Sequence, residues 1–190
     1  MNFAVEQWPR THRLTVDEYY KMAEAGVLAP DARVELIEGV IVDMAPIGSR
    51  HAGVVNLLTR ILVQAAGDRA VISIQQSLRL GKRSEPQPDV AILRPRSDMY
   101  RSAHPTADDV LLVIEVSDTT LKFDRGRKLA LYARHGVPEV WVVDLVNNQL
   151  HCMSQPVAER YQVERSFQGS TEVSVAALPD TRLQLRQLFE

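Results

Sequence analysis

The sequence predicts an α/β fold with α+β character, in one domain over residues 15–190 that follows an N-terminal arm over residues 1–14. Two apolar, β-prone runs at residues 111–116 and 140–143 enclose a helical stretch, which is the pattern of a right-handed crossover between parallel strands. A hairpin pattern lies near the start of the chain. The tail alternates apolar and polar residues, as antiparallel strands at the edge of a sheet do.

Composition limits the classes of protein to consider. The 190 residues, 45% of them hydrophobic, suffice for one sizeable core. The formal net charge of −2 excludes a general attraction to nucleic acid, so any such binding requires a local basic patch. A single cysteine, Cys152, excludes an internal disulfide and fits a reducing compartment. Because the chain shows no signal-peptide pattern at its start and no membrane-length apolar run, we expect a cytoplasmic protein without a membrane partner.

The first half of the chain contains clear helix and turn signals. Thr15 and Glu18 form a capping box, and Gly26 can end the helix that follows. Glu38-Gly39 is the expected turn of the hairpin. The elements expected in this half are a helix over 15–26, a hairpin over 34–44, a helix over 51–67, and strands over 70–74 and 77–80 that could also be one long strand.

The second half is expected to hold the centre of the sheet. Pro88 fixes the backbone just before an apolar strand that starts at Asp89, and polar loops precede and follow that strand. The nearly continuous apolar run at 111–116 suits a strand buried on both faces. The remaining elements are expected as a helix over 121–135, a strand over 140–143, tail strands near 150–153, 160–163 and 172–175, and a closing segment over 183–189.

Two acids lie at or near the ends of apolar strands, where a carboxylate is costly unless it is paired. The segment between Asp89 and Glu115 is long enough for one strand, a loop and the return into a neighbouring strand. Two carboxylates on adjacent strand ends can hold a hard divalent cation such as Mg²⁺ or Mn²⁺. A loop cap at Asp89 and a salt bridge at Glu115 would explain each acid alone, but the pair together favours a metal site.

Three more residues are candidates by position. Lys128 lies one turn after Asp124, where it either forms a surface pair with that acid or offsets the charge of a phosphate. Glu35 in the hairpin can supply a third carboxylate, whereas Glu38 fits a solvated turn better. His51 opens a helix, where a cation is unfavourable, so a neutral imidazole there can be a ligand, an acid–base group or simply a cap.

Basic residues gather in the two loops that bracket the Asp89 strand, and they can either contact phosphates or form a solvated rim. The candidates for nucleic-acid contacts are Lys82, Arg83, Arg94 and Arg96. A zinc site is not expected, because Cys152 has no second cysteine and the histidines have no companions at metal-ligand spacing. Neither a phosphate-binding loop nor a Gly-x-Ser-x-Gly elbow occurs in the sequence.

Pro88-Asp89 followed by Glu115-x-Ser117 is similar to the signature of PD-(D/E)XK nucleases, with Ser117 where that signature has lysine. Over roughly residues 15–190, the ordered set of motifs resembles the Uma-two family of putative restriction endonucleases within that superfamily. The matching pieces are Glu35-Leu36-Ile37-Glu38-Gly39, His51 at a helix start, Pro88-Asp89-Val90, Ile114-Glu115-Val116-Ser117, Asp124, Lys128, Tyr132, Gly136-Val137-Pro138-Glu139 and Trp141-Val142-Val143-Asp144.

The resemblance implies a restriction-endonuclease-like mixed β-sheet flanked by helices, a divalent metal, and a lysine that has moved from strand to helix. By that match Lys128 takes the lysine role, and Glu35 and His51 join the site. We therefore expect a Mg²⁺-dependent endonuclease that cleaves DNA, with Asp89 and Glu115 holding the metal. The alternative is a catalytically silent module of the same fold that binds nucleic acid or protein. Exposed strands in the tail favour a homodimer.

Overall fold

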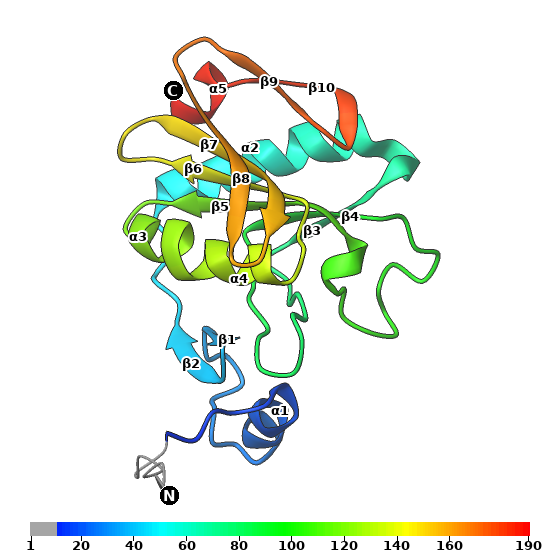
Figure 1. The fold of residues 1–190 in the computed structure, drawn as a ribbon, viewed down its shortest axis with the longest axis vertical. Helices are drawn as coiled ribbons and strands as arrows, with labels where there is room; N and C mark the ends of the chain where they lie inside the picture. The colour runs from blue at the N-terminus through cyan, green and yellow to red at the C-terminus, as the bar shows by residue number, and fades with distance from the viewer. Residues whose placement is uncertain (1–10) are drawn as a thin grey trace, which may run out of the picture.

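The computed structural model describes residues 11–190, and its centre is a six-stranded sheet in the order β3-β4-β5-β6-β7-β8 (Figure 1). β5 and β6 run parallel, and every other neighbouring pair in this sheet is antiparallel. The predicted crossover and the antiparallel edge are both confirmed. The strands are β3 (Val71–Ile74), β4 (Val90–Leu93), β5 (Val110–Ser117), β6 (Glu139–Asp144), β7 (Gln149–Val157) and β8 (Arg160–Gln168).

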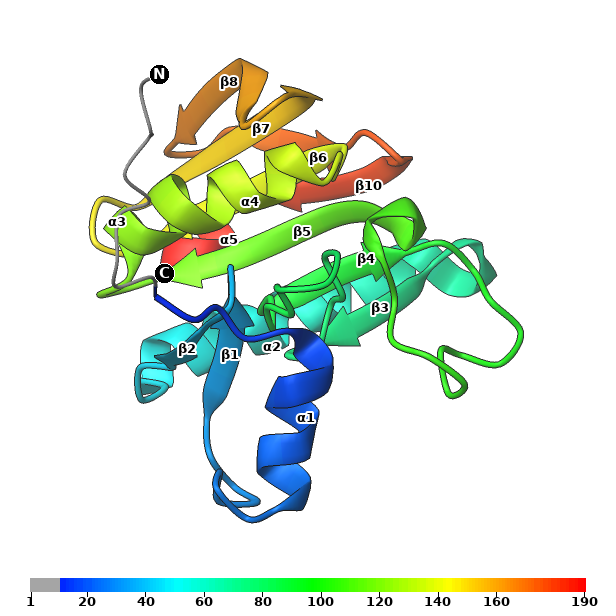
Figure 2. The ribbon, with the colours of Figure 1, turned by 60° about the horizontal axis from the view of Figure 1, so that its bottom comes forward.

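Helices cover both faces of this sheet (Figure 2), which is why β5 is apolar almost throughout. One face packs against α2 (Ser49–Ala66) and against the C-terminal elements β9 (Glu172–Val175), β10 (Leu178–Gln184) and α5 (Arg186–Phe189). The other face packs against a helix formed by α3 (Leu121–Phe123), the π-helical turn η3 (Asp124–Lys128) and α4 (Leu129–Arg134). Short 3-10 turns, η1 (Gly67–Arg69) and η2 (Ala107–Asp109), lead into β3 and β5.

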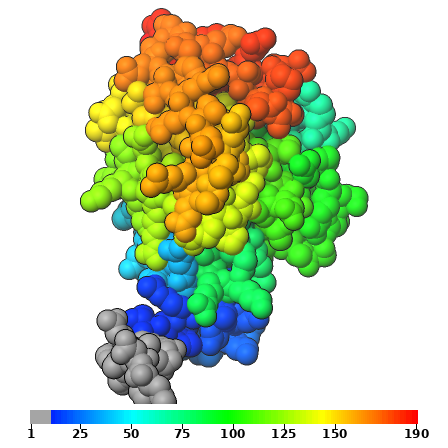
Figure 3. Space-filling view, viewed as in Figure 1, coloured from blue at the N-terminus to red at the C-terminus, as the bar shows by residue number. Residues whose placement is uncertain are grey.

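The N-terminal elements form a lobe at the end of the molecule opposite the C-terminal strands (Figure 3). This lobe contains α1 (Val16–Glu24) and a separate two-stranded sheet of β1 (Val34–Ile37) and β2 (Val40–Asp43). Glu38 and Gly39 turn the hairpin with positive φ angles of 51° and 76°, as a two-residue hairpin turn requires. The predicted capping box of Thr15 and Glu18 is present at α1.

The expectation of strand structure over residues 77–80 is wrong. Gln75 has a φ of 49° and turns the chain away at the end of β3. The N–H groups of Leu78 and Leu80 then bond to the carbonyls of Pro86 and Ser84, so the segment folds back on itself as a loop. Both leucines are buried, and their alternation with polar residues therefore came from packing against the core rather than from a strand.

Part of the expected N-terminal arm, residues 1–10, lies outside the described residues. Residues 11–14 have no regular structure, and the N–H of Leu14 bonds to the carbonyl of Gly39 at 3.0 Å. Within residues 11–190, no helix combines the length and the apolar character needed to cross a membrane.

Candidate active site

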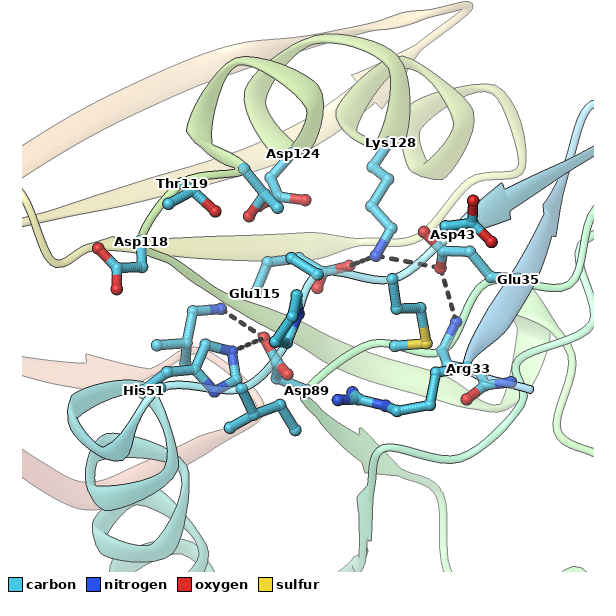
Figure 4. A pocket seen from close by; sticks show the side chains of 18 residues that line it. Arg33, Glu35, Asp43, His51, Asp89, Glu115, Asp118, Thr119, Asp124 and Lys128 are labelled. Carbon is cyan, nitrogen blue, oxygen red and sulfur yellow. Dashed lines mark hydrogen bonds and ion pairs between the residues drawn. The ribbon is translucent and has the colours of Figure 1, made fainter. Parts of the chain in front are cut away.

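All five site residues predicted from the sequence line one cavity of about 200 Å³ (Figure 4). Its walls come from the hairpin, from the segment that leads into α2, from the ends of β4 and β5, and from the π-helical turn η3. The five residues are Glu35, His51, Asp89, Glu115 and Lys128. Chain segments far apart in sequence therefore meet at one point, as the resemblance implied.

Asp89 lies just before β4, beside the end of β5. Its Oδ2 accepts the N–H of Val116 at 2.8 Å and lies 3.1 Å from His51 Nε2, while Oδ1 accepts from Gln75 Nε2 at 3.2 Å. Burial alone would raise the pKa of the Asp89 carboxyl, but His51 and these donors outweigh burial and hold the pKa below its ordinary value. Asp89 is therefore ionised at neutral pH.

His51 lies in the first turn of α2 and is oriented by Asp89. The bond to Asp89 raises the pKa of His51 above its ordinary value, although burial acts in the opposite direction. The Asp89 carboxylate offsets the unfavourable position of a protonated His51 at the start of a helix. Within residues 11–190, His51 Nδ1 is buried without a hydrogen-bond partner. His51 is thus more than a helix cap, because it holds the Asp89 carboxylate in place.

Lys128 reaches down from η3 between two glutamates, as Figure 4 shows. Its Nζ lies 3.1 Å from Glu115 Oε1 and 3.2 Å from Glu35 Oε2, and only 5% of the residue is exposed. The structure therefore excludes the surface pair with Asp124 that the sequence also allowed. Burial alone would lower the pKa of the Lys128 ammonium, but the surrounding carboxylates, Glu115 first, raise it above its ordinary value. Lys128 is a permanent cation in this site.

Glu115 is the most strongly perturbed acid of the cavity. Burial raises the pKa of its carboxyl, Lys128 lowers it and the nearby charges of Asp124, Asp89 and Glu35 raise it, so that the pKa is about 8. Tyr132 donates its hydroxyl to Glu115 Oε1 at 2.5 Å. Burial is the main cause of the raised pKa of Glu115, and the negative charges of the neighbouring carboxylates add to it; the same carboxylates raise the pKa of Lys128 against the effect of burial.

Asp124 belongs to the same cluster, although sequence reasoning gave it no role of its own. It is buried, and its Oδ2 accepts hydroxyl groups from Ser117 at 2.7 Å and from Thr120 at 2.5 Å. The π-helical turn brings Asp124 and Lys128 to the same cavity, and such turns are common at functional sites. The signal that could have found it is its position on the helix that carries Lys128.

The donor set fits a hard divalent cation. Four buried carboxylates face one ammonium and one imidazole; the acids are Glu35, Asp89, Glu115 and Asp124. With His51 protonated, the cavity holds two surplus negative charges when all four acids are ionised, and one when Glu115, whose pKa is about 8, keeps its proton. Among residues 11–190, no three acid, histidine or cysteine side chains converge to chelate an ion.

One cation at the mouth of the cavity was missed by the sequence analysis. Arg33 precedes β1, lines the cavity and is exposed. Within the described part of the chain it forms no ion pair, whereas Lys128 and His51 are both engaged with carboxylates. Figure 4 places Arg33 on the hairpin side, across from Asp118 and Thr119. No sequence pattern marked it, because it precedes a strand as many surface arginines do.

The predicted nucleic-acid contacts separate into two groups, and none of them lines the cavity. Lys82 and Arg83 are exposed in the loop that touches the hairpin. Arg94 and Arg96 lie in the loop after β4, where Arg96 forms a two-bond pair with Asp98 at 2.5 and 2.7 Å.

Comparison with known proteins gives a match to a family model and matches to solved structures. The family model Uma2, described as "Putative restriction endonuclease", matches residues 16–186. A crystal structure of a putative nuclease belonging to DUF820 from Anabaena variabilis ATCC 29413 is 16% identical in sequence, covers 93% of this chain and 97% of its own, and superposes with a TM-score of 0.72. That likeness concerns the fold. A search of the curated proteins finds no match.

Proposed function

Since the chain belongs to the Uma2 family of putative restriction endonucleases, we propose that it is an endonuclease that uses Mg²⁺ or Mn²⁺ to hydrolyse phosphodiester bonds in DNA. The observation that carries the proposal is the buried cluster in which an ammonium and surplus carboxylates share one cavity. The surplus carboxylates can bind a divalent cation, and the cation together with the ammonium can bind a negatively charged substrate.

Asp89 and Glu115 would hold the metal, because they come from adjacent strands and both face the cavity. When bound, the metal supplies a Lewis acid and lowers the pKa of coordinated water. Asp89 is ionised beforehand and is held by His51 and by the N–H of Val116. His51 is therefore assigned to orienting Asp89 rather than to binding the metal.

Lys128 is assigned the role of a fixed cation. Because its pKa is raised, it does not act as a base at neutral pH. Its ammonium can donate to an attacking water or to a non-bridging phosphate oxygen and offset charge as it develops. Glu35, held by the N–H of Gln87 at 3.1 Å, keeps the ammonium in the cavity when Glu115 turns to the metal.

The test is a cleavage assay on plasmid and single-stranded DNA, with Mg²⁺, with Mn²⁺ and with EDTA, together with calorimetry of metal binding. Wild type should cleave only with metal, and Asp89→Asn and Glu115→Gln should abolish cleavage and weaken metal binding. Glu139→Gln is the matched control, because Glu139 is a largely buried acid on β6 outside the cavity. Metal binding unchanged in both site variants would refute the metal assignment. Nucleic-acid binding without cleavage under any metal would favour the silent module.

A further inference from the structure

The turn of the hairpin, at Glu38 and Gly39, lies against cations from other parts of the chain. The Glu38 carboxylate pairs with Arg127 Nε at 2.9 Å and with Arg134 Nη1 at 2.6 Å. The N–H of Gly39 donates to the carbonyl of Arg83 at 2.7 Å. The helix that follows β5 and the loop before β4 therefore meet at this turn.

Two further cations lie on the same side of the molecule. A Cβ on Gly39 would come within 2.7 Å of Cβ of Arg13, and the carbonyl of Lys82 accepts the N–H of Val16 at 2.9 Å. These side chains are exposed, apart from the half-buried Arg127. We call the five cations around the turn the turn patch: Arg13, Lys82, Arg83, Arg127 and Arg134.

The turn patch keeps a positive excess after its ion pairs are counted. Within residues 11–190, Glu38 and Glu159 are the acids paired with its arginines, which leaves three cations without an ion pair in this part of the chain. At the nearby start of α1, the acids Asp17 and Glu18 lower the excess from three to one when His12, which lies 3.5 Å from Glu18, is neutral. A local positive surface on a chain with a formal net charge of −2 is a candidate anion-binding surface.

The turn patch adjoins the cavity through two consecutive residues of η3. Lys128 turns inward to Glu35, while Arg127 turns outward to Glu38. Glu35 and Glu38 are three residues apart on the hairpin, about 10 Å along an extended strand. Because nucleic acid rises about 3.4 Å per nucleotide along one strand, the patch begins roughly three nucleotides from the cavity.

We propose that the turn patch binds the phosphate backbone of the nucleic-acid strand on one side of the cleavage point, an inference that rests on the proposed nuclease function. The observations that select this partner are the positive excess, its exposure and its continuity with a cavity suited to phosphodiester chemistry. The basic residues of the turn patch read no sequence and fix the position of the strand.

The test is binding of fluorescent duplex and single-stranded DNA in EDTA, where no metal-dependent cleavage occurs. The variant Arg13→Ala/Lys82→Ala/Arg83→Ala removes the three uncompensated cations and leaves both arginine pairs of Glu38 intact. Losing three phosphate contacts should reduce the slope of log affinity against log salt concentration by about 2.7 for duplex DNA. Between 50 and 200 mM salt, wild type should therefore lose about 40-fold more affinity than the variant. The control Arg60→Ala/Arg165→Ala/Arg182→Ala removes three exposed arginines on α2, β8 and β10 and should retain the wild-type slope.

A second variant changes the patch in the opposite direction. Glu38→Gln removes the carboxylate that neutralises Arg127 and Arg134, and exposed pairs of this kind contribute little to stability. Its DNA affinity should rise and its salt dependence should steepen. A wild-type slope in the triple variant, or tighter binding of poly-glutamate than of DNA, would overturn the proposal. Patch-dependent DNA binding without cleavage under any metal would refute the nuclease function and leave this inference standing.

Discussion

Raising the pH without divalent metal should destabilise this protein through Glu115. Its folded-state pKa is about 8, above the ordinary value of 4.5, so the folded state holds a proton that the unfolded state releases. The stability that Glu115 contributes is present below pH 4.5 and is lost as the pH rises toward 8. Each pH unit within that window is worth about 1.4 kcal/mol, so the loss between pH 5 and pH 7 is about 3 kcal/mol.

Two neighbours also titrate, and they must be separated from Glu115. His51 has a raised pKa, so its contribution is present below its ordinary value of 6.5 and is lost as the pH passes its folded value. Asp89 has a lowered pKa, so its contribution is lost only as the pH falls below 3.8. The difference between wild type and Glu115→Gln removes the His51 and Asp89 terms common to both proteins and isolates Glu115.

The assay is urea unfolding of wild type and Glu115→Gln in EDTA at pH 5, 6 and 7, with the free energy of unfolding extrapolated to water. Wild type should lose about 3 kcal/mol more than the variant over this range. Saturating Mg²⁺ should remove most of the difference, because a cation on the ionised carboxylate replaces the proton. Parallel pH profiles for the two proteins would refute the claim that burial, with the neighbouring carboxylates, raises the pKa of Glu115.

Three further predictions concern catalysis and assembly. Lys128→Ala should lower the cleavage rate by about two to three orders of magnitude with metal binding retained, as for loss of one transition-state donor. Adding Ser117→Lys to this variant should restore only part of the cleavage activity, because Ser117 is fully buried and bonded to Asp124. Full activity in Lys128→Ala would contradict the assigned role. Arg33→Ala should raise KM with kcat little changed, and Arg33→Lys should recover part of the loss, whereas an unchanged KM would remove Arg33 from substrate binding. Light scattering should detect the homodimer expected from the exposed tail strands, of which β8 pairs with β7 alone within residues 11–190; a monomer at all concentrations would contradict it.

The central sheet could be predicted because its signals are local. The apolar run of β5 fixes a strand buried on both faces, and the helix that Gly136 ends forces the next strand to run parallel. The error at residues 77–80 has a physical cause: a buried loop that satisfies its own N–H groups shows the same alternation as a strand. The sign of the φ angle at Gln75, which decides between the two, is not encoded in hydrophobic pattern.

The members of the site could be predicted, but their pairing could not. Asp89 and Glu115 were found because each is a costly acid at a strand end. Whether Lys128 faces solvent or the cavity depends on how the hairpin docks on η3, a long-range contact in which Glu35 lies beside Lys128 and Glu38 beside Arg127. Single-sequence patterns carry no such information.

The distribution of charge explains how a chain with a net negative charge can act on a polyanion. Four of its buried acids meet in the cavity, where surplus carboxylates favour a divalent cation and repel phosphate until that cation is present. Among residues 11–190, several cations without an ion pair lie near the cavity, at Arg33 on its mouth and around the hairpin turn. Net charge averages these two regions and conceals both. Because β1 runs between them, the hairpin supplies an acid that holds the Lys128 ammonium and at the same time joins the cavity to the turn patch. Under the proposed function, the docking of the hairpin therefore determines both the chemistry and the path of the substrate.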